Sequence, residues 1–429
     1  MKRCFTPLRA AVIAALTAFL LLGPAQAAPP RVTLTMWCSP YAAEAGWAIQ
    51  MVNLWNRKHL DVQVRLQKMP SERVAEDVLR DAIRDHKTPD VCAHMFPANV
   101  HEFVKMGGLL PLDGQTSLMA ASAKRSGANE MFRSADGKLY QIPWKCNPIM
   151  LQYNRSMLDG TRPPRTYGEL LALGERLRKR GILVWAPVPV DRWYARYYDF
   201  YPLYLAASGG KGFIDAAGRP ALDQAAAIAV LDLLAETFKR GFAPTKELYR
   251  DPAAQNEAFA SGKLAILVTG PWNVQMITEL AGNTIQFGFT PLVVPNSTDP
   301  TKPVMTYGNF RNISIFSTCQ HPAEAAALVE FLISPPSDAA FLDATSELPY
   351  RPGLLTDATF RVHLQRRPHL LAFARQLPWV RPIDNTPHFN RILGILSRQL
   401  VDVAVKGTRS APAAVRDAVD EMTQILGER

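Results

Sequence analysis

Aromatic side chains that carry hydroxyl groups gather in one short segment, Trp193–Tyr201, which holds four tyrosines. Small-molecule pockets place a few polar groups on mostly apolar walls, and tyrosine offers both kinds of surface. On a single helix, Trp193, Tyr197 and Tyr201 share one face. Such a stripe is ordinarily part of a core, but each buried tyrosine must satisfy its hydroxyl, which favours a cleft here. We therefore predict that Tyr197, Tyr198, Asp199 and Tyr201 line a ligand cleft.

Trp272 is the strongest single aromatic candidate. It follows Gly270-Pro271, a turn signal at the end of an apolar run that predicts a buried strand. A ring in this place can stand at the strand end as a flat platform, or it can pack beneath the turn. We predict the platform.

The elements that must position these side chains alternate between strands and helices. Apolar or alternating runs predict three strands, and apolar side chains at helical spacing predict two helices between them: residues 31–37, 47–55, 62–66, 72–85 and 90–94. This order predicts a parallel, doubly wound α/β lobe. Ligands of such sheets lie beyond the carboxyl ends of the strands. That rule selects Ser39–Glu44 after the first strand and His94, Met95 and Phe96 after the third.

The amino-terminal residues form a secretory signal. Basic Lys2 and Arg3 precede an apolar run over residues 10–22, and Ala25-Gln26-Ala27 follows it. This pattern predicts a signal peptide over residues 1–27, cleaved after Ala27, with an uncleaved anchor as the alternative. No cysteine lies at the junction, so no lipid anchor is expected. The protein is expected to act outside the cytoplasmic membrane.

Length and charge limit the remaining possibilities. The chain has 429 residues, and about 400 of them would remain after cleavage, which exceeds the ~250–300 residues that one core usually supports. Two lobes or domains are therefore expected. The net charge is +10, but export makes nucleic acid an improbable partner, and a solvated basic surface is the simpler interpretation.

Four cysteines remain after cleavage: Cys38, Cys92, Cys146 and Cys319. In an oxidising compartment they could form two disulfides in any of three pairings, or they could be buried free thiols. Both possibilities stay open. No Cys-x-x-Cys or Cys/His spacing indicates zinc, so neither a metal nor a cofactor is expected.

Several short motifs, in a fixed order along the chain, resemble those of one family. They are Thr35-Met36-Trp37, Pro89-Asp90-Val91, Met106–Asp113, Gly137–Tyr140, Tyr153-Asn154, Phe259–Lys263, Gly270–Trp272, His321–Ala326 and Leu348–Arg351. With these motifs the chain resembles the extracellular solute-binding proteins that feed sugar-type ABC importers, among them maltose-binding and glycerol-3-phosphate-binding proteins. The similarity covers nearly all of the chain after the signal.

This resemblance implies an α/β fold of two doubly wound lobes joined by hinge strands, the type II periplasmic binding protein fold. It implies one lobe from residues 28–146 plus 308–347 and a second from 147–307 plus 348–429. The chain would then cross between the lobes near Asn147, Tyr307 and Leu348. The resemblance also implies that Trp272 stacks on the ligand.

The segment Tyr307–Arg311 departs from the family pattern. Members commonly carry glycines here, but this chain keeps only Gly308 and has Asn309 and Arg311. Larger side chains narrow the cleft, so the usual way in which the family binds a neutral oligosaccharide is in doubt here. Together with Arg351 at another crossing, Arg311 suggests an anionic group on the ligand, because arginine binds phosphate or carboxylate bidentately. An interlobe salt bridge is the equal alternative.

The sequence thus predicts a periplasmic receptor of an ABC importer. It would capture a sugar, a polyol or a sugar or glycerol phosphate, close around it, and deliver it as a monomer to the membrane permease. A secreted carbohydrate enzyme and a binding protein for peptides or amino acids are the alternatives. Ser208–Lys211 matches Ser-x-x-Lys, but the partner motifs of penicillin-type enzymes are absent. The predicted ligand contacts are Tyr41, Glu44, Phe96, Asn147, Tyr197, Tyr198, Asp199, Tyr201, Trp272, Tyr307, Asn309, Arg311, Tyr350 and Arg351.

Overall fold

The structure is a computed structural model. It describes residues 32–72, 74–125, 127–245, 251–282, 284–351 and 353–427. The predicted signal peptide and its cleavage site after Ala27 lie outside the described residues.

The first lobe begins with a parallel sheet and the helices between its strands. Strands β1 (Val32–Cys38), β2 (Val62–Lys68) and β3 (Val91–Met95) pair in the order β2-β1-β3. Helices α2 (Ala42–Lys58) and α3 (Ala75–Arg84) connect them. Because the apolar side chains of α2 recur at helical spacing, one face of the helix is buried against the sheet. The predicted strand–helix–strand order is confirmed.

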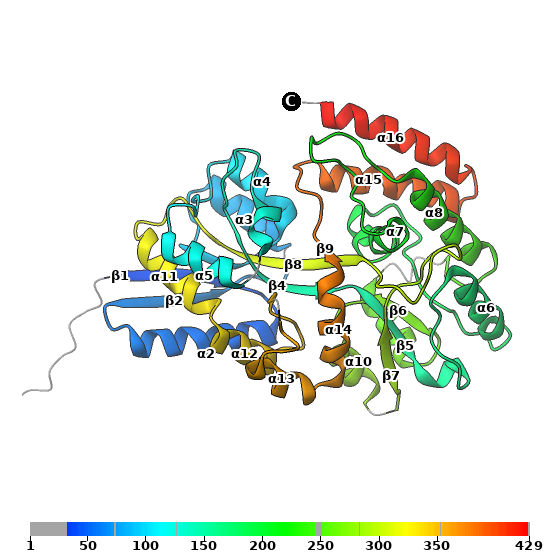
Figure 1. Ribbon diagram of the computed structural model, residues 1–429, viewed down its shortest axis with the longest axis horizontal. Coiled ribbons are helices and arrows are strands. Elements are labelled where there is room, and N and C mark those ends of the chain that lie inside the picture. Colours follow the sequence, from blue (N-terminus) through cyan, green and yellow to red (C-terminus); the bar gives the residue numbers. More distant parts are fainter. Residues whose placement is uncertain are drawn as a thin grey trace, which may run out of the picture.

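Two strands from far along the chain complete this sheet (Figure 1). Strand β8 (Thr306–Ile315) pairs antiparallel with β3 on one side and with β4 (Ile142–Pro148) on the other. The short strand β9 (Val380–Arg381) pairs in parallel with the beginning of β8. The remaining first-lobe helices are α4 (Pro97–Lys105), α5 (Thr116–Arg125), η1 (Gly127–Phe132), α11 (Pro322–Leu332), α12 (Pro335–Ala344), α13 (Ala358–Gln365), α14 (Pro368–Gln376) and η5 (Leu377–Trp379).

The second lobe is built around a smaller sheet of antiparallel strands. Strand β5 (Met150–Asn154) lies between β6 (Ile266–Thr269) and β7 (Phe287–Thr290). The helices of this lobe are η2 (Arg155–Leu158), α6 (Tyr167–Arg178), η3 (Trp193–Tyr197), α7 (Phe200–Ser208), α8 (Gln224–Lys239), α9 (Pro252–Ala260), α10 (Asn273–Ala281), α15 (Phe389–Leu400), the π-helical turn Val401–Val405 and α16 (Ala411–Gly427).

Three segments cross between the lobes side by side. Strand β4 leads into β5 at Ile149, whose backbone N–H donates to the carbonyl of Tyr307 at the start of β8 (3.0 Å). Thr306 returns a hydroxyl hydrogen bond to the Ile149 carbonyl (2.7 Å). The third crossing is β9, paired with Thr306 and Tyr307. Hydrogen bonds between the crossings keep their spacing fixed where the lobes meet.

The third crossing between the lobes was predicted near Leu348, but the structure has it at β9 (Val380–Arg381). Residues 348–377 pack with the first lobe, because the apolar faces of α13 and α14 (Phe360, Leu364, Leu370 and Phe373) join the cluster that contains β1 and α2. The second-lobe cluster resumes at Ile383. The packing therefore assigns residues 348–377 to the first lobe rather than to the predicted 348–429 part of the second.

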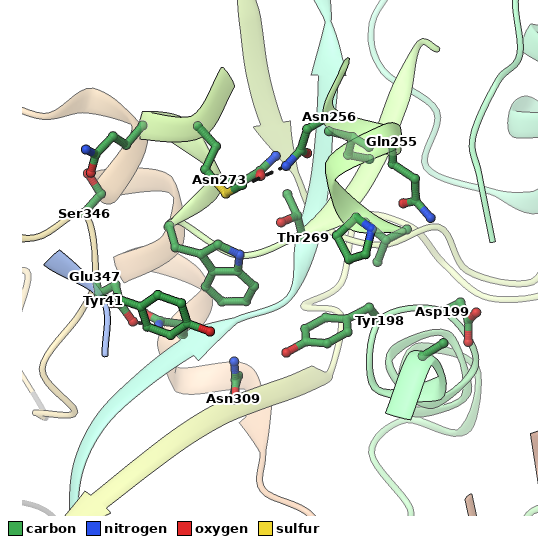
Figure 2. Close-up of a pocket in the computed structure, with 18 of the residues that line it drawn as sticks. Tyr41, Tyr198, Asp199, Gln255, Asn256, Thr269, Asn273, Asn309, Ser346 and Glu347 are labelled. Atoms are coloured by element: carbon green, nitrogen blue, oxygen red, sulfur yellow. Dashed lines mark hydrogen bonds between the residues drawn. The ribbon is translucent and has the colours of Figure 1, made fainter. Parts of the chain in front are cut away.

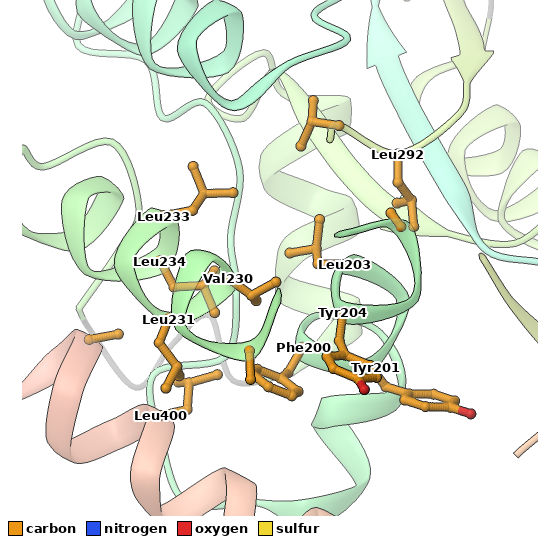
Figure 3. Close-up of a cluster of buried hydrophobic side chains, with 14 of the residues drawn as sticks. Phe200, Tyr201, Leu203, Tyr204, Val230, Leu231, Leu233, Leu234, Leu292 and Leu400 are labelled. Carbon is orange, nitrogen blue, oxygen red and sulfur yellow. The ribbon is translucent and has the colours of Figure 1, made fainter. Parts of the chain in front are cut away.

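The core of the second lobe includes much of the tyrosine-rich segment. Phe200, Tyr201 and Tyr204 of α7 pack against Leu231 and Leu234 of α8 in the same buried cluster (Figure 3). Ring contacts reinforce this packing: the Tyr201 and Phe389 centroids are 5.2 Å apart. The one-helix interpretation of residues 193–201 is wrong, since η3 ends at Tyr197 and α7 begins at Phe200.

The cysteines Cys38, Cys92, Cys146 and Cys319 are all unpaired and buried. Burial raises the pKa of the Cys38 thiol to about 11 and those of Cys92 and Cys319 to about 12, so these thiols are protonated at neutral pH. Of the two possibilities that the sequence left open, the structure has the free thiols.

Among the described helices, none is both long and apolar enough to span a membrane alone. Only α11 and α12 taken together reach that length and composition, and they meet at a bend of 59°.

Candidate ligand cleft

A cavity of about 640 Å³ opens between the two lobes. Its volume falls within the ~300–1,000 Å³ typical of small-molecule sites. In Figure 2, Tyr41 and Glu347 lie on one side of the cavity and Tyr198 on the other, with Asn309 on the strand beneath them. Both lobes therefore contribute walls, and the crossing strands form the floor.

Eight of the fourteen predicted contacts line this cavity: Tyr41, Glu44, Asn147, Tyr198, Asp199, Trp272, Asn309 and Arg311. Tyr41 precedes α2 and Glu44 lies in its first turn, directly after the carboxyl end of β1. Asn147 lies near the end of β4, opposite Asn309 of β8 in the sheet register. The strand-end rule and the crossing strands thus bring residues that are distant in sequence to one place.

The first-lobe wall carries a buried cluster of charges around Lys145, a residue that the sequence analysis missed. Its Nζ lies 2.7 Å from Glu44 Oε2 and 2.9 Å from Glu347 Oε2. The Lys145 side chain is only 2% exposed. Asn147 donates to the same Glu347 oxygen through Nδ2. A lysine inside the fully buried strand β4 is the signal that could have found this cluster, because a buried charge needs partners.

Burial raises the pKa values of the Glu44 and Glu347 carboxyl groups, and the Lys145 ammonium that they share lowers them. Burial raises the pKa of Glu44, but the Lys145 ammonium and the neighbouring His94 outweigh it, so the pKa lies well below its ordinary value. For Glu347, burial prevails over Lys145 and raises the pKa. Burial also lowers the pKa of His94, which favours a neutral imidazole. The cluster therefore offers carboxylate oxygens that accept hydrogen bonds.

Arg311 lies on β8 with its guanidinium over the ring of Phe96, 4.7 Å from the ring centroid. Its Nη1 donates to Asn309 Oδ1 (2.9 Å) and to the Phe310 carbonyl (3.0 Å). Phe96 itself is not a lining residue of the cavity. Phe96 was predicted to contact the ligand directly, but it instead supports the Arg311 guanidinium from below.

The second-lobe wall combines aromatic rings with aliphatic and amide side chains. The rings of Tyr198 and Trp272 meet edge to face with their centroids 6.1 Å apart. A Cβ atom on Gly270 would lie 2.0 Å from the Trp272 ring, so glycine is required for the ring to take this place. Asn273, the next residue, donates to Gln152 Oε1 (2.9 Å) in a buried pair. The Gly-Pro-Trp sequence thus seats the indole in the cavity wall.

Asp199 lines the cavity but is already engaged by its own lobe. Its carboxylate accepts from the Phe200 backbone N–H (2.6 Å) as the cap of α7, and it lies 3.1 Å from Arg196 Nη2. Arg196 is fully buried, so the pair is internal to the second lobe. The predicted acceptor role of Asp199 therefore competes with a structural one.

Four other predicted tyrosine contacts are not lining residues of the cavity. The hydroxyl of Tyr197 donates to Asn390 Oδ1 (2.8 Å), and that of Tyr201 donates to the Pro382 carbonyl (3.1 Å). Tyr307 reaches Asn309 Oδ1 (3.4 Å) from a buried position, and Tyr350 packs on Phe310. These predictions are corrected because the hydroxyls of Tyr197, Tyr201 and Tyr307 find partners inside the protein and the Tyr350 ring packs within the first lobe.

Arg351 does not reach the cavity either. It binds Asp338 through Nε and the Ile333 carbonyl through Nη2 (2.6 Å). Asp338 is fully buried and also pairs with Arg125, so Arg351 closes an ion cluster within the first lobe. Arg351 was predicted either to bind an anionic ligand or to form a salt bridge between the lobes. It forms a salt bridge, but with a partner in its own lobe. The anionic interpretation is left with Arg311 alone.

A cavity between two α/β lobes that are joined by three adjacent crossings is the architecture of a hinged binding protein. The family model described as bacterial extracellular solute-binding protein matches residues 50–370. The chain belongs to this family. The predicted class of protein, a solute-binding protein and not an enzyme, is thereby confirmed.

Relatives and solved structures agree with this assignment. The chain is 27% identical to the maltotriose-binding protein of Pyrococcus abyssi over 239 residues, covering 54% of this chain and 47% of that protein. It is 22% identical to the maltodextrin-binding protein MdxE of Bacillus subtilis over 344 residues, 76% of each. Its fold matches the Thermus thermophilus maltotriose-binding protein bound with maltotriose, with a TM-score of 0.70 and 19% identity, over 92% of this chain and 100% of that one. The predicted type II fold is confirmed.

Proposed function

We propose that this protein captures a carbohydrate, specifically a short oligosaccharide or a related sugar, in the cavity between its lobes. The observation that carries the proposal is the division of the cavity into two kinds of wall. Trp272 and Tyr198 offer aromatic surface to the apolar faces of a sugar, and Glu44 and Glu347 offer acceptors to its hydroxyls. The relatives named for maltotriose and maltodextrins support the same ligand class.

We further propose that the closed, loaded protein is the form recognised by the permease of an ABC importer. Closure follows from the ligand, because a solute that contacts both walls binds the closed form better and shifts the population toward it. The hydrogen-bonded crossings at Ile149, Thr306 and Val380 are the candidate hinge.

The proposed site of action is the periplasm, after cleavage following Ala27. The family is extracellular, which supports an exported protein. Amino-terminal sequencing of protein recovered from the periplasmic fraction is expected to begin at Ala28. A chain that retains Met1 in the membrane fraction would instead establish an uncleaved anchor.

Thermal unfolding of the mature protein with a ligand panel tests the proposed ligand class. The panel contains maltose, maltotriose, longer maltodextrins, polyols, and sugar and glycerol phosphates, with amino acids and short peptides as controls. A ligand at 100 times its Kd stabilises the protein by about 2.7 kcal/mol, which is a readily measured rise in Tm. A shift with peptides alone, or none with any carbohydrate, would sink the proposal. Chemical conversion of a panel member, detected by chromatography, would favour the enzyme alternative.

A further inference from the structure

The cavity contains one arginine that forms no direct salt bridge with any described residue, although, against the effect of burial, the more distant carboxylates of Glu76 and Glu44 favour its charged form and raise its pKa. Arg311 lines the cavity, and no ion pair joins it to a carboxylate anywhere in the described part of the chain. The other charged groups buried in the walls are paired: Lys145 with Glu44 and Glu347, and Asp199 with Arg196. Arg311 is half-buried, and a guanidinium partly removed from water without a direct anionic partner carries a desolvation penalty that a bound anion would offset.

The guanidinium is also held in one orientation. Phe96 supports its face at 4.7 Å, and Nη1 is occupied by the Asn309 side chain and the Phe310 carbonyl. The hydrogen bonds among the described residues do not use Nε or Nη2. These two groups form the edge of the planar fork that binds a carboxylate or phosphate through two parallel hydrogen bonds. Little side-chain entropy remains to be lost on binding, because the fork is already stacked and tethered.

The charges of the Lys145 cluster and Arg311 favour a ligand with a single negative group. Glu44 and Glu347 share one ammonium, so the Lys145 cluster leaves one negative charge, and Arg311 supplies one positive charge. An anion at Arg311 is attracted there, but a second anionic group nearer Glu347 would be repelled. Neutral hydroxyls suit that end, because they donate to carboxylate oxygens. Figure 2 shows Glu347 and Asn309, the tether of Arg311, at different parts of the wall.

We infer that Arg311 forms an oxyanion subsite and that the ligand is an acidic sugar with one anionic group, a carboxylate or a phosphate, on an otherwise neutral carbohydrate. This inference rests on the proposed function and refines its ligand class.

Isothermal titration calorimetry with matched ligands tests the subsite. The probes are maltose, its 6′-phosphate, and the disaccharide in which glucuronic acid replaces the non-reducing glucose. The wild-type protein is expected to bind one acidic probe at least ~10-fold more tightly than maltose, because hydrogen bonds to charged groups contribute about 1.5–3 kcal/mol. Whichever acidic probe binds more tightly identifies the phosphate or the carboxylate as the group recognised.

The variant Arg311→Gln keeps hydrogen-bonding capacity but removes the charge. It is expected to lose about 10- to 100-fold in affinity for the acidic probe and less than about 3-fold for maltose. Arg311→Lys, a safeguard against misfolding of the glutamine variant, retains part of the preference. Arg192→Gln is the matched control, since Arg192 also stacks on an aromatic ring (5.2 Å from Tyr194) but does not line the cavity. Its affinities should equal those of wild type.

Two results would overturn the inference. One is a wild-type protein that binds maltose as tightly as both acidic probes. The other is an Arg311→Gln variant, with unchanged ligand-free Tm, that loses affinity for neutral and acidic probes equally. In either case, binding of maltose would still support the proposed function of a carbohydrate receptor. Failure of all three probes and of every neutral carbohydrate would instead remove the proposed function itself.

Discussion

The two walls of the cavity are built on different physical principles. The first-lobe wall is a buried electrostatic cluster in which Lys145 holds Glu44 and Glu347 within 2.9 Å. The second-lobe wall is a set of aromatic rings, Trp272 and Tyr198, seated by tight backbone turns. The first wall contributes directional acceptors at a high desolvation cost, and the second contributes apolar area at almost none. We therefore expect the first wall to dominate stability and selectivity, and the second to dominate affinity.

The largest expected effect is on stability, from Lys145→Met. Removing the ammonium leaves two buried carboxyl groups without a counterion, and breaking a buried pair in this way costs about 3–5 kcal/mol. Urea denaturation at pH 7 measures the loss. Lys124→Met, which changes an exposed lysine of α5, should cost almost nothing. A small loss for Lys145→Met would show that the first wall does not depend on its charges.

Replacing the second wall's indole should affect binding instead. Trp272→Ala is expected to weaken carbohydrate binding by about 2 kcal/mol or more, roughly 30-fold, as for a central aromatic anchor. Ligand-free stability should change less, because the ring lies at the cavity surface. Trp193→Ala, an exposed tryptophan outside the cavity lining, serves as the control. Equal losses for both variants in calorimetry would contradict the assignment of affinity to Trp272.

The pH dependence of stability separates the two carboxyl groups of the first wall. The pKa of Glu44 lies below its unfolded value of about 4.3, so this group stabilises the fold above that pH and loses the contribution as pH falls toward the folded pKa. Glu44→Gln should cost about 1.5–3 kcal/mol at pH 7 and progressively less below about pH 4.

Glu347 should behave in the opposite sense. Its raised pKa means that its ionised form carries a cost in the folded protein, which is relieved as pH falls. Glu347→Gln should therefore cost less than Glu44→Gln at pH 7. Denaturation curves of both variants and wild type between pH 3 and pH 8 make the comparison, and parallel curves for the two variants would refute it.

The smallest expected effect comes from the aromatic side chain on the first lobe. Tyr41 is 66% exposed at the rim of the cavity. Rim residues contribute little to affinity, so Tyr41→Ala should weaken binding less than about 5-fold in the same calorimetry. A loss equal to that of Trp272→Ala would mean that aromatic stacking is shared between the walls.

The architecture could be predicted from local patterns, because alternating strands and helices bury regular stripes of apolar side chains. The strand-end rule selected the segment Ser39–Glu44, which contains the lining residues Tyr41 and Glu44, since the rule depends only on element order. It failed for Tyr197 and Tyr201, because spacing on a helix cannot tell a cleft from a core and the helix itself breaks before Phe200.

Long-range partners account for most of what the sequence could not show. Lys145 is meaningful only once β4 and α2 bring Glu44 and Glu347 to it across 101 and 202 positions of sequence, respectively. In the same way, Arg351 looked like a ligand contact until α12 placed Asp338 beside it. Pairings of this kind depend on tertiary packing, and no local propensity encodes them.

The place of β8 in the first sheet has a consequence for the order in which the chain can fold. This strand lies between β3 and β4, yet the whole second-lobe sheet precedes it along the chain. During synthesis, the first sheet remains divided until residue 315 has emerged, although β5, β6 and β7 can pair by residue 290. Non-local pairing of this kind slows folding. A chain whose first sheet closes only after the strands of the second sheet have been made is well suited to passing through a secretion channel before its fold is complete.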